Sequence, residues 1–351
     1  LSIFLPNIVP DFKFIETYNE NVKLSANIHD LSLLLKHFYP DLNIANGTQM
    51  DFSFSNNQQK AQLSVFSDFI EYNDCIFKDI NFSSSETNSY TDSILNLSLS
   101  LGKVEKKGLF ELDNLLLSTN LKDNTIDFEL GWFNDDSSNI GDFDFSLFFD
   151  SEDSIIFSLN HGNLSSSSLG NWKWGDSTDC YIQNGEAYIE KMTVSNNNQS
   201  LSLYGDIGFS KKDIFKIEFD KINLNNLTSF YNIEDEIDIN GILDAKIQLS
   251  SLLGVTGFSS KILLDSTKIN DYSIGKFDFS SSWDQSANRF NIVGSLINEY
   301  QNEEIRVNNC YYYPDSMEFN QLIGDVQLNN FKIDFISPFL PNVILSDLYG
   351  D

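Results

Sequence analysis

The sequence is poor in the residues that build metal sites and disulfide frameworks. Only three Cys and three His occur among 351 residues. Cys75, Cys180 and Cys310 are far apart, odd in number and outside any CxxC pair, which argues against a disulfide framework and against a zinc site. We therefore expect three unpaired thiols, no bound metal and no cofactor.

Basic residues are also scarce. The chain has 22 Lys and Arg against 51 Asp and Glu, a formal net charge of −29. This balance excludes nucleic acid as a partner, because no cationic surplus exists to neutralise phosphates, and it argues against docking by charge onto anionic lipid. A hydrophobic fraction of 41% with 30 Phe argues equally against a disordered chain. We expect the acidic side chains to form a solvated face that keeps an apolar β protein soluble.

Long apolar runs and chain-start signals are missing as well. No stretch of about 18 apolar residues occurs, so we expect no membrane-spanning helix within the sequence. The chain begins at Leu1 without Met and ends at Asp351 in the middle of a recurring pattern. We interpret it as an internal fragment of a longer protein, whose targeting segment or membrane anchor lies outside these residues.

Strict alternation of apolar and polar residues dominates what is present, for example in Phe143-Asp-Phe145-Ser-Leu147 and Phe215-Lys-Ile217-Glu-Phe219. This period of two predicts antiparallel strands with one apolar and one wet face. Polar turn-formers such as Asn134–Asn139 and Asp284–Asn288 separate the strands. The candidates for the apolar face are Phe52, Phe54, Phe128, Leu130, Phe143, Phe145, Phe215, Ile217, Phe219, Ile247, Leu249, Phe277, Phe279, Phe290 and Ile292.

One short helix is expected, from Asp30 to Tyr39. Asp30 is a candidate N-cap, Leu31, Leu34, Leu35 and Phe38 follow helical spacing, and Pro40 ends the pattern.

The chain also repeats itself. A strand, a short Leu/Phe-rich element and a Gly followed by a strand recur at residues 24–55, 222–250 and 326–351, with landmark glycines Gly47, Gly241 and Gly350. A degenerate copy at 109–146 is expected between the first two. Ile140-Gly-Asp-Phe-Asp-Phe-Ser146 also matches Ile274-Gly-Lys-Phe-Asp-Phe-Ser280. We interpret residues 1–351 as one elongated repetitive β fragment.

No constellation of catalytic residues is recognisable, and we expect no enzyme. His29 and His37 lie at i and i+8, which is not a metal-ligand spacing, and His161 stands alone. Asp135, Asp136, Asn139 and Asp142 loosely resemble a calcium loop but lack its ordered spacing, so a solvated turn is favoured. No nucleophile elbow, P-loop or dinucleotide fingerprint is present.

The order of the repeat carries a resemblance. Ile222 to Asn226, Asn240-Gly241-Ile242, Ile274-Gly275, Gly294-Ser-Leu296 and Val326 to Asn330 make up a unit that resembles the TamB-type members of the AsmA-like family, within the bridge-like lipid transfer proteins. The resemblance implies a long antiparallel sheet curled into an open apolar groove (a β-taco), with short helices in its repeats.

The same resemblance implies a periplasmic protein of a diderm bacterium, anchored in the inner membrane and supporting outer-membrane assembly. Its ligands would be phospholipid acyl chains, and its partner an outer-membrane barrel-assembly protein of the TamA/BamA type. Alternation alone also fits an ordinary β-sandwich or solenoid core. The alternative function is therefore a structural or adhesive extracellular β-repeat protein without a lipid conduit.

Overall fold

The computed structural model describes residues 4–8, 21–55, 60–88, 93–106, 109–225, 239–269, 272–298, 300, 302–314 and 321–329. Strands make up 77% of these residues and helix 2%, which confirms an all-β chain. The strands belong to one antiparallel sheet of 21 strands. Contacts divide the chain into two units, Leu1–Ser167 with Asn171–Gly185 and Ser168–Gly170 with Glu186–Asp351.

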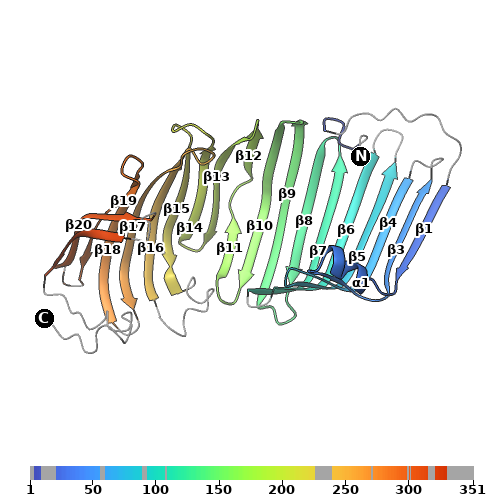
Figure 1. Cartoon of the computed structure of the whole chain (residues 1–351), viewed down its shortest axis with the longest axis horizontal. Helices are drawn as coiled ribbons and strands as arrows, with labels where there is room; N and C mark the ends of the chain where they lie inside the picture. The colour runs from blue at the N-terminus through green and yellow to red at the C-terminus, as the bar shows by residue number, and fades with distance from the viewer. Residues whose placement is uncertain are drawn as a thin grey trace. The chain divides into compact units, whose positions relative to one another are not determined.

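The first unit contains the helix and the strands up to β12 (Figure 1). Its elements are β1 (Asn21–Ile28), α1 (Ser32–Phe38), β2 (Leu42–Ile44), β3 (Thr48–Ser55), β4 (Lys60–Tyr72), β5 (Cys75–Asn88), β6 (Ser93–Lys106), β7 (Phe110–Lys122), β8 (Thr125–Phe133), β9 (Asn139–Ser151), β10 (Ser154–Ser166), β11 (Gly170–Trp174, its first residue in the second unit) and β12 (Thr178–Gln183).

The second unit contains the remaining strands. They are β13 (Glu186–Asn196), β14 (Gln199–Ile207), β15 (Ile214–Asn223), β16 (Ile239–Ser250), β17 (Gly257–Ile269), β18 (Tyr272–Asp284), β19 (Arg289–Ile297), β20 (Glu303–Tyr313) and β21 (Gln321–Leu328).

Within each unit the strands pair antiparallel with their neighbours in the chain. In the first unit β1 pairs with β3, and each strand from β3 to β10 pairs with the next. The short strands β2 and β12 pair with parts of β4 and β10. In the second unit every strand from β13 to β21 pairs with the next. This up-and-down order follows from the short polar turns, which reverse the chain between neighbouring strands.

The strands that alternation predicts are strands in the structure. Residues 126–130 lie in β8, 215–219 in β15 and 277–279 in β18, and the predicted turns 134–139 and 284–288 connect strands. The positive φ angles of Asn197 and Asn288 fit tight reversals, because Asn tolerates the left-handed region better than most residues.

Helix α1 confirms the predicted helix but not its predicted start. It begins at Ser32, and its N-cap position is Leu31, which makes no side-chain capping bond, so the prediction of Asp30 as N-cap is wrong. A Leu side chain has no acceptor for the free amides of the first turn, so this helix start lacks the stabilisation of a side-chain cap. Leu35 is buried, whereas Phe38 is 64% exposed, so the expected apolar stripe is only partly covered.

β-bulges interrupt the alternation at several strands. The register shifts between Leu159 and His161 in β10, and between Phe219 and Ile222 in β15. Phe219 lies opposite Ala245, and Ile222 lies opposite Leu243, two residues further along the regular partner strand. Phe219 and Ile222 therefore share one face although they are three residues apart. The extra residue of the bulge thus brings Ile222, which strict alternation would place on the wet face, to the apolar face.

Two of the landmark glycines of the predicted repeat adopt positive φ, Gly47 at +86° and Gly241 at +152°. Gly47 lies in the turn before β3, whereas Gly241 lies at a register shift inside β16. Gly350 and most of the copy at 326–351 lie outside the described residues. The repeat therefore stays a prediction.

Candidate functional site

The register of the first unit places its six candidates on one face. Residues directly opposite in an antiparallel pair project to the same side. Leu130 lies opposite Phe143, and Phe128 lies opposite Phe145. Phe52 lies opposite Leu63 and starts the same row at the other end of the unit. Alternate residues along each strand add Phe54 to this face, which we call the apolar face.

Aromatic rings pack against one another on the apolar face of the first unit. The rings of Phe128 and Phe145 stack at 4.7 Å between centroids, and Trp132 stacks on Phe143 at 5.5 Å. Phe143 also meets Trp174 edge to face at 5.2 Å. Cross-strand aromatic pairs of this kind stabilise a sheet beyond their buried area.

Two glycines make room for these rings. Gly141 lies opposite Trp132, and a Cβ at Gly141 would lie only 2.1 Å from the indole. Gly162 lies opposite Phe143, and a Cβ there would meet both Phe143 and Trp174 at 2.9 Å. The glycines let large flat side chains lie down along the backbone.

The second unit repeats this arrangement with its own candidates. Phe215, Ile217 and Phe219 of β15 lie opposite Leu249, Ile247 and Ala245 of β16. The same row continues through β18 and β19, where Phe277 and Phe279 lie opposite Leu296 and Gly294, and Ile292 and Phe290 lie opposite Ser281 and Trp283. All nine candidates of this unit therefore share its apolar face.

The side chains of the apolar faces are only partly covered. Each of the candidates is half-buried except Phe52, which is 36% exposed. The fully buried clusters are small; one comprises Ile80, Leu101 and Val104, and another Ile274 and Leu296. Apolar side chains that touch neighbours on their own face but keep part of their surface free can be covered by a further apolar body.

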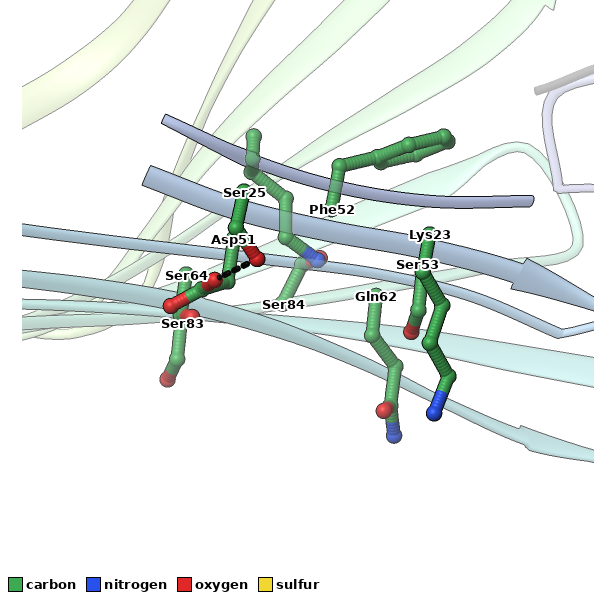
Figure 2. Close-up of a pocket in the computed structure, with 10 residues that line it drawn as sticks. Lys23, Ser25, Asp51, Phe52, Ser53, Gln62, Ser64, Ser83 and Ser84 are labelled. Atoms are coloured by element: carbon green, nitrogen blue, oxygen red, sulfur yellow. Dashed lines mark hydrogen bonds between the residues drawn. The ribbon is translucent and has the colours of Figure 1, made fainter. Parts of the chain in front are cut away.

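The opposite face carries the polar residues of the alternation together with some exposed apolar side chains, such as Phe133 and Ile140, and we call it the polar face. Lys23, Ser25, Asp51, Ser53 and Gln62 line a hollow of ≈ 420 Å³ on β1, β3 and β4. Figure 2 shows Lys23, Ser53 and Gln62 pointing to one side of the strands and Phe52 to the other. The Ser25 hydroxyl donates to the Asp51 carboxylate at 2.5 Å.

The loose calcium-like loop is held together by donors of the chain itself. Asp136 accepts the Ser138 amide, Asp135 accepts the Asn114 side-chain amide, and Asn139 accepts the Trp132 indole N–H. Hydrogen bonds from Ser138 lower the pKa of the Asp136 carboxyl. Asp142 lies apart, 3.9 Å from His161. Among the described residues no group of three or more potential ligands could hold a metal.

The three cysteines are unpaired thiols, as expected, and burial raises the pKa of Cys180. His29 precedes α1, His37 lies in the last turn of α1, and His161 lies in β10.

One segment on the apolar face is missing from the sequence-based prediction. Phe4 and Leu5 are each only 5% exposed and pack against Leu121 of β7. The segment has no alternation of apolar and polar residues, so the pattern that predicts strands does not identify it. A recurrence could have revealed it: Phe4-Leu-Pro-Asn-Ile8 returns as Phe339-Leu-Pro-Asn-Val343.

No helix among the described ranges has both the length and the apolar character needed to cross a membrane. No protein-family model, no curated protein and no solved structure matches the chain, so its apolar face is interpreted from its own residues.

Proposed function

We propose that the apolar face of each unit binds the acyl chains of phospholipids. The observation that carries this proposal is the register, which gathers every candidate of a unit on one face, where all of them except Phe52 are half-buried. Such a face needs no specific polar contact to hold a lipid.

The driving force is hydrophobic burial. Each methylene taken out of water contributes roughly 0.8 kcal/mol, so an acyl chain gains enough from a continuous apolar row to stay bound without a headgroup site. The rings of Phe128, Phe145 and Phe157 form part of such a row across three strands, with centroids 4.7 Å and 5.9 Å apart. A chain lying across the strands contacts the same kind of surface at each step.

We propose further that the sheet curls into an open groove along which phospholipids move between the two membranes of a diderm bacterial envelope. The resemblance to the AsmA-like family supports this wider role. On this proposal the protein works in the periplasm, is anchored in the inner membrane by a segment outside residues 1–351, and meets a barrel-assembly protein of the outer membrane.

The test places a charge on either face of the same strand. Phe145→Glu and Phe279→Glu put a carboxylate on the apolar faces, and Ser146→Glu and Ser280→Glu put it one residue away on the polar faces. The full chain is mixed with donor vesicles that contain fluorescent phosphatidylethanolamine and with unlabelled acceptor vesicles, and transfer is followed by dequenching. We expect the Phe variants to lose transfer at least about fivefold, because a desolvated charge opposes acyl chains.

The Ser variants are the matched controls and are expected to keep transfer. Circular dichroism reports whether each variant retains its strand content. Wild-type protein that neither carries nor transfers phospholipid would overturn the proposal. Folded Phe variants that transfer as well as the Ser variants would overturn it too. Phe variants that unfold while wild type carries no lipid would favour a sealed structural core.

A further inference from the structure

A five-residue segment of the chain lies on the apolar face of the first unit. Phe4 and Leu5 are each 5% exposed and form a cluster with Leu121. The half-buried side chains around this cluster come from β6, β8 and β9 and from the segment itself, and they are Leu95, Leu97, Ile126, Phe149 and Ile8. We call Phe4–Ile8 the strap.

The strap contacts residues of the candidate lipid-binding face. Leu97 lies opposite Thr119, which lies opposite Phe128; Leu121 lies opposite Ile126, which lies opposite Leu147. The strap therefore covers the part of the apolar face nearest the turn between β7 and β8. Phe4 and Leu5 are more deeply buried there than any of the candidate residues.

The sequence of the strap sets its shape. Leu5-Pro6-Asn7-Ile8 forms a turn in which the Ile8 amide donates to the Leu5 carbonyl at 3.2 Å. Pro at the second position and Asn at the third suit such a turn, because Pro fixes φ and Asn tolerates unusual backbone angles. The turn leaves Phe4 and Leu5 to enter the apolar face together.

Polar contacts fix the strap at the ends of strands. The Asn124 amide donates to the Phe4 carbonyl at 2.9 Å, and the Asn7 amide donates to the Asn124 side chain at 2.8 Å. The Asn7 side chain donates to the carbonyls of Phe149 and Asp150 at 2.8 and 2.9 Å. Asn7 thus hydrogen-bonds to Asn124 in the β7–β8 turn and to backbone carbonyls at the end of β9, while Phe4 and Leu5 pack on the apolar surface.

The segment is a recurring sequence element. Phe339-Leu-Pro-Asn-Val343 repeats it with Ile replaced by Val, and both copies are followed by a further β-branched residue, Val9 and Ile344. The second copy lies outside the described residues. The four residues that recur are those with a role in the first copy: Phe and Leu pack on the apolar face, Pro lies in the turn, and Asn makes the hydrogen bonds. Their joint recurrence is what we expect of a docking motif.

We propose that the Leu95–Leu97–Leu121–Ile126–Phe149 surface is a docking site for a Phe-Leu-Pro-Asn peptide segment, filled by the strap, and that the docked strap excludes acyl chains from this end of the apolar face. The exclusion rests on the proposed lipid binding, whereas the docking does not. Phe and Leu side chains and acyl chains compete for the same apolar area, and only the peptide adds the Asn7 hydrogen bonds.

The docking is tested in the full chain by amide hydrogen exchange at Asn124. Asn7→Ala removes the side chain that donates to two carbonyls, and we expect exchange at Asn124 to become about tenfold faster as the strap detaches more often. Asn120→Ala is the matched control, because Asn120 is exposed on the polar face of β7. Unchanged exchange in Asn7→Ala, or equal acceleration in Asn120→Ala, would overturn the docking site.

A second measurement uses a released strap. In the Phe4→Asp/Leu5→Asp double variant, a synthetic peptide of residues 2–8 is expected to bind, and its Asn7→Ala version to bind about tenfold more weakly. Equal binding of the two peptides, or none, would overturn the assignment of Asn7 as the anchor of the docking motif.

The exclusion is tested with a photoreactive palmitic acid cross-linked to wild type and to the double variant. We expect labels near Phe128 and Phe145 in both proteins, and labels at Leu95, Leu97 and Ile126 only in the double variant. Labels at those three residues in wild type would overturn the exclusion. No label on the apolar face of either protein would overturn the exclusion and the proposed lipid binding together, while the exchange and peptide results decide the docking separately.

Discussion

Two stretches of the molecule have nearly the same sequence and different backbones. Ile140-Gly-Asp-Phe-Asp-Phe-Ser146 lies in β9 of the first unit, and Ile274-Gly-Lys-Phe-Asp-Phe-Ser280 lies in β18 of the second. The two Phe of each stretch lie on the apolar face. The two Ile differ in burial: the side chain of Ile140 is 40% exposed, and that of Ile274 is 5% exposed.

The difference arises at the glycine. β9 continues regular pairing with β8 through Gly141, so Ile140 lies opposite Phe133 on the polar face. In β18 the register shifts at Gly275, whose φ is +103°, and Ile274 joins Leu296 and Phe277 in a buried cluster. A bulge has moved one residue to the other face.

The neighbouring strand decides which backbone forms. Gly141 faces the indole of Trp132, which fills the space that its missing side chain leaves. Gly275 faces Thr267 in β17, whose preceding residue Ser266 has a φ of +52°. The same motif is thus accommodated in two ways. In β9 the strand stays regular and an indole ring covers the glycine, whereas in β18 the strand bulges at the glycine opposite a bulge in β17. The comparison teaches that faces are assigned by partners as well as by alternation.

The largest expected effect comes from placing a charge at each Ile. Ile274→Asp buries a carboxylate against Leu296 and is expected to lower the free energy of unfolding by about 4 kcal/mol. Ile140→Asp places the same charge on the polar face and is expected to cost less than about 0.5 kcal/mol. Denaturant unfolding of both variants measures the difference. Equal destabilisation would mean that the two Ile lie on equivalent faces.

The next effect concerns the left-handed glycine. Gly275→Ala adds a Cβ that would lie 2.3 Å from the Ile297 carbonyl oxygen, in a backbone conformation that disfavours any side chain. We expect a loss of about 2–3 kcal/mol in the free energy of unfolding. Gly131→Ala is the control, because its Cβ would find only one atom, at 3.7 Å. A Gly275→Ala protein as stable as Gly131→Ala would contradict the bulge.

These positions also show how far the sequence predicts the fold. Alternation identifies the strands and the faces wherever pairing is regular, as for Phe143 and Phe145, because side chains of a strand point to opposite sides in turn. It cannot place Ile274 or Ile222, since each lies beyond a bulge, and a bulge depends on the register of two strands at once.

The candidate site was predictable in part for the same reason. The apolar face is specified by the alternation within each strand, so its residues can be predicted without knowledge of the neighbouring strands. The strap was not predicted, because Phe4 and Leu5 contact residues about 90 to 145 positions away, and nothing in five residues of local sequence specifies such a partner. Within the sequence, the recurrence at Phe339–Val343 is the signal that could have singled out the strap.

A smaller effect is expected at the glycine under the ring. Gly141→Ala forces the Trp132 indole off the strand, which costs its stack on Phe143 and its hydrogen bond to Asn139. We expect a loss of about 1–2 kcal/mol and a changed near-ultraviolet circular dichroism spectrum. In a Trp132→Ala background the same substitution is expected to cost little, since the clash is gone. Additive costs in this double-mutant cycle would refute the pairing.

The smallest effect is a pH dependence at the turns beside the two motifs. At the end of β18, the Ser286 hydroxyl donates to the Asp284 carboxylate at 2.6 Å, and this bond, together with the Ala287 and Ser286 amides and Arg289, lowers the pKa of Asp284. Because the folded pKa is lowered, the carboxylate contributes stability above the ordinary pKa of Asp, about 3.9, and loses it as the pH falls through the folded pKa. We expect the denaturant midpoints of wild type and Asp284→Asn to differ at neutral pH and to converge in acid.

Asp136→Asn, in the turn before β9, is expected to show the same pH dependence, because Ser138 lowers the pKa of Asp136. A gap that stays constant from neutral pH into acid would show that the loss comes from shape and not from charge.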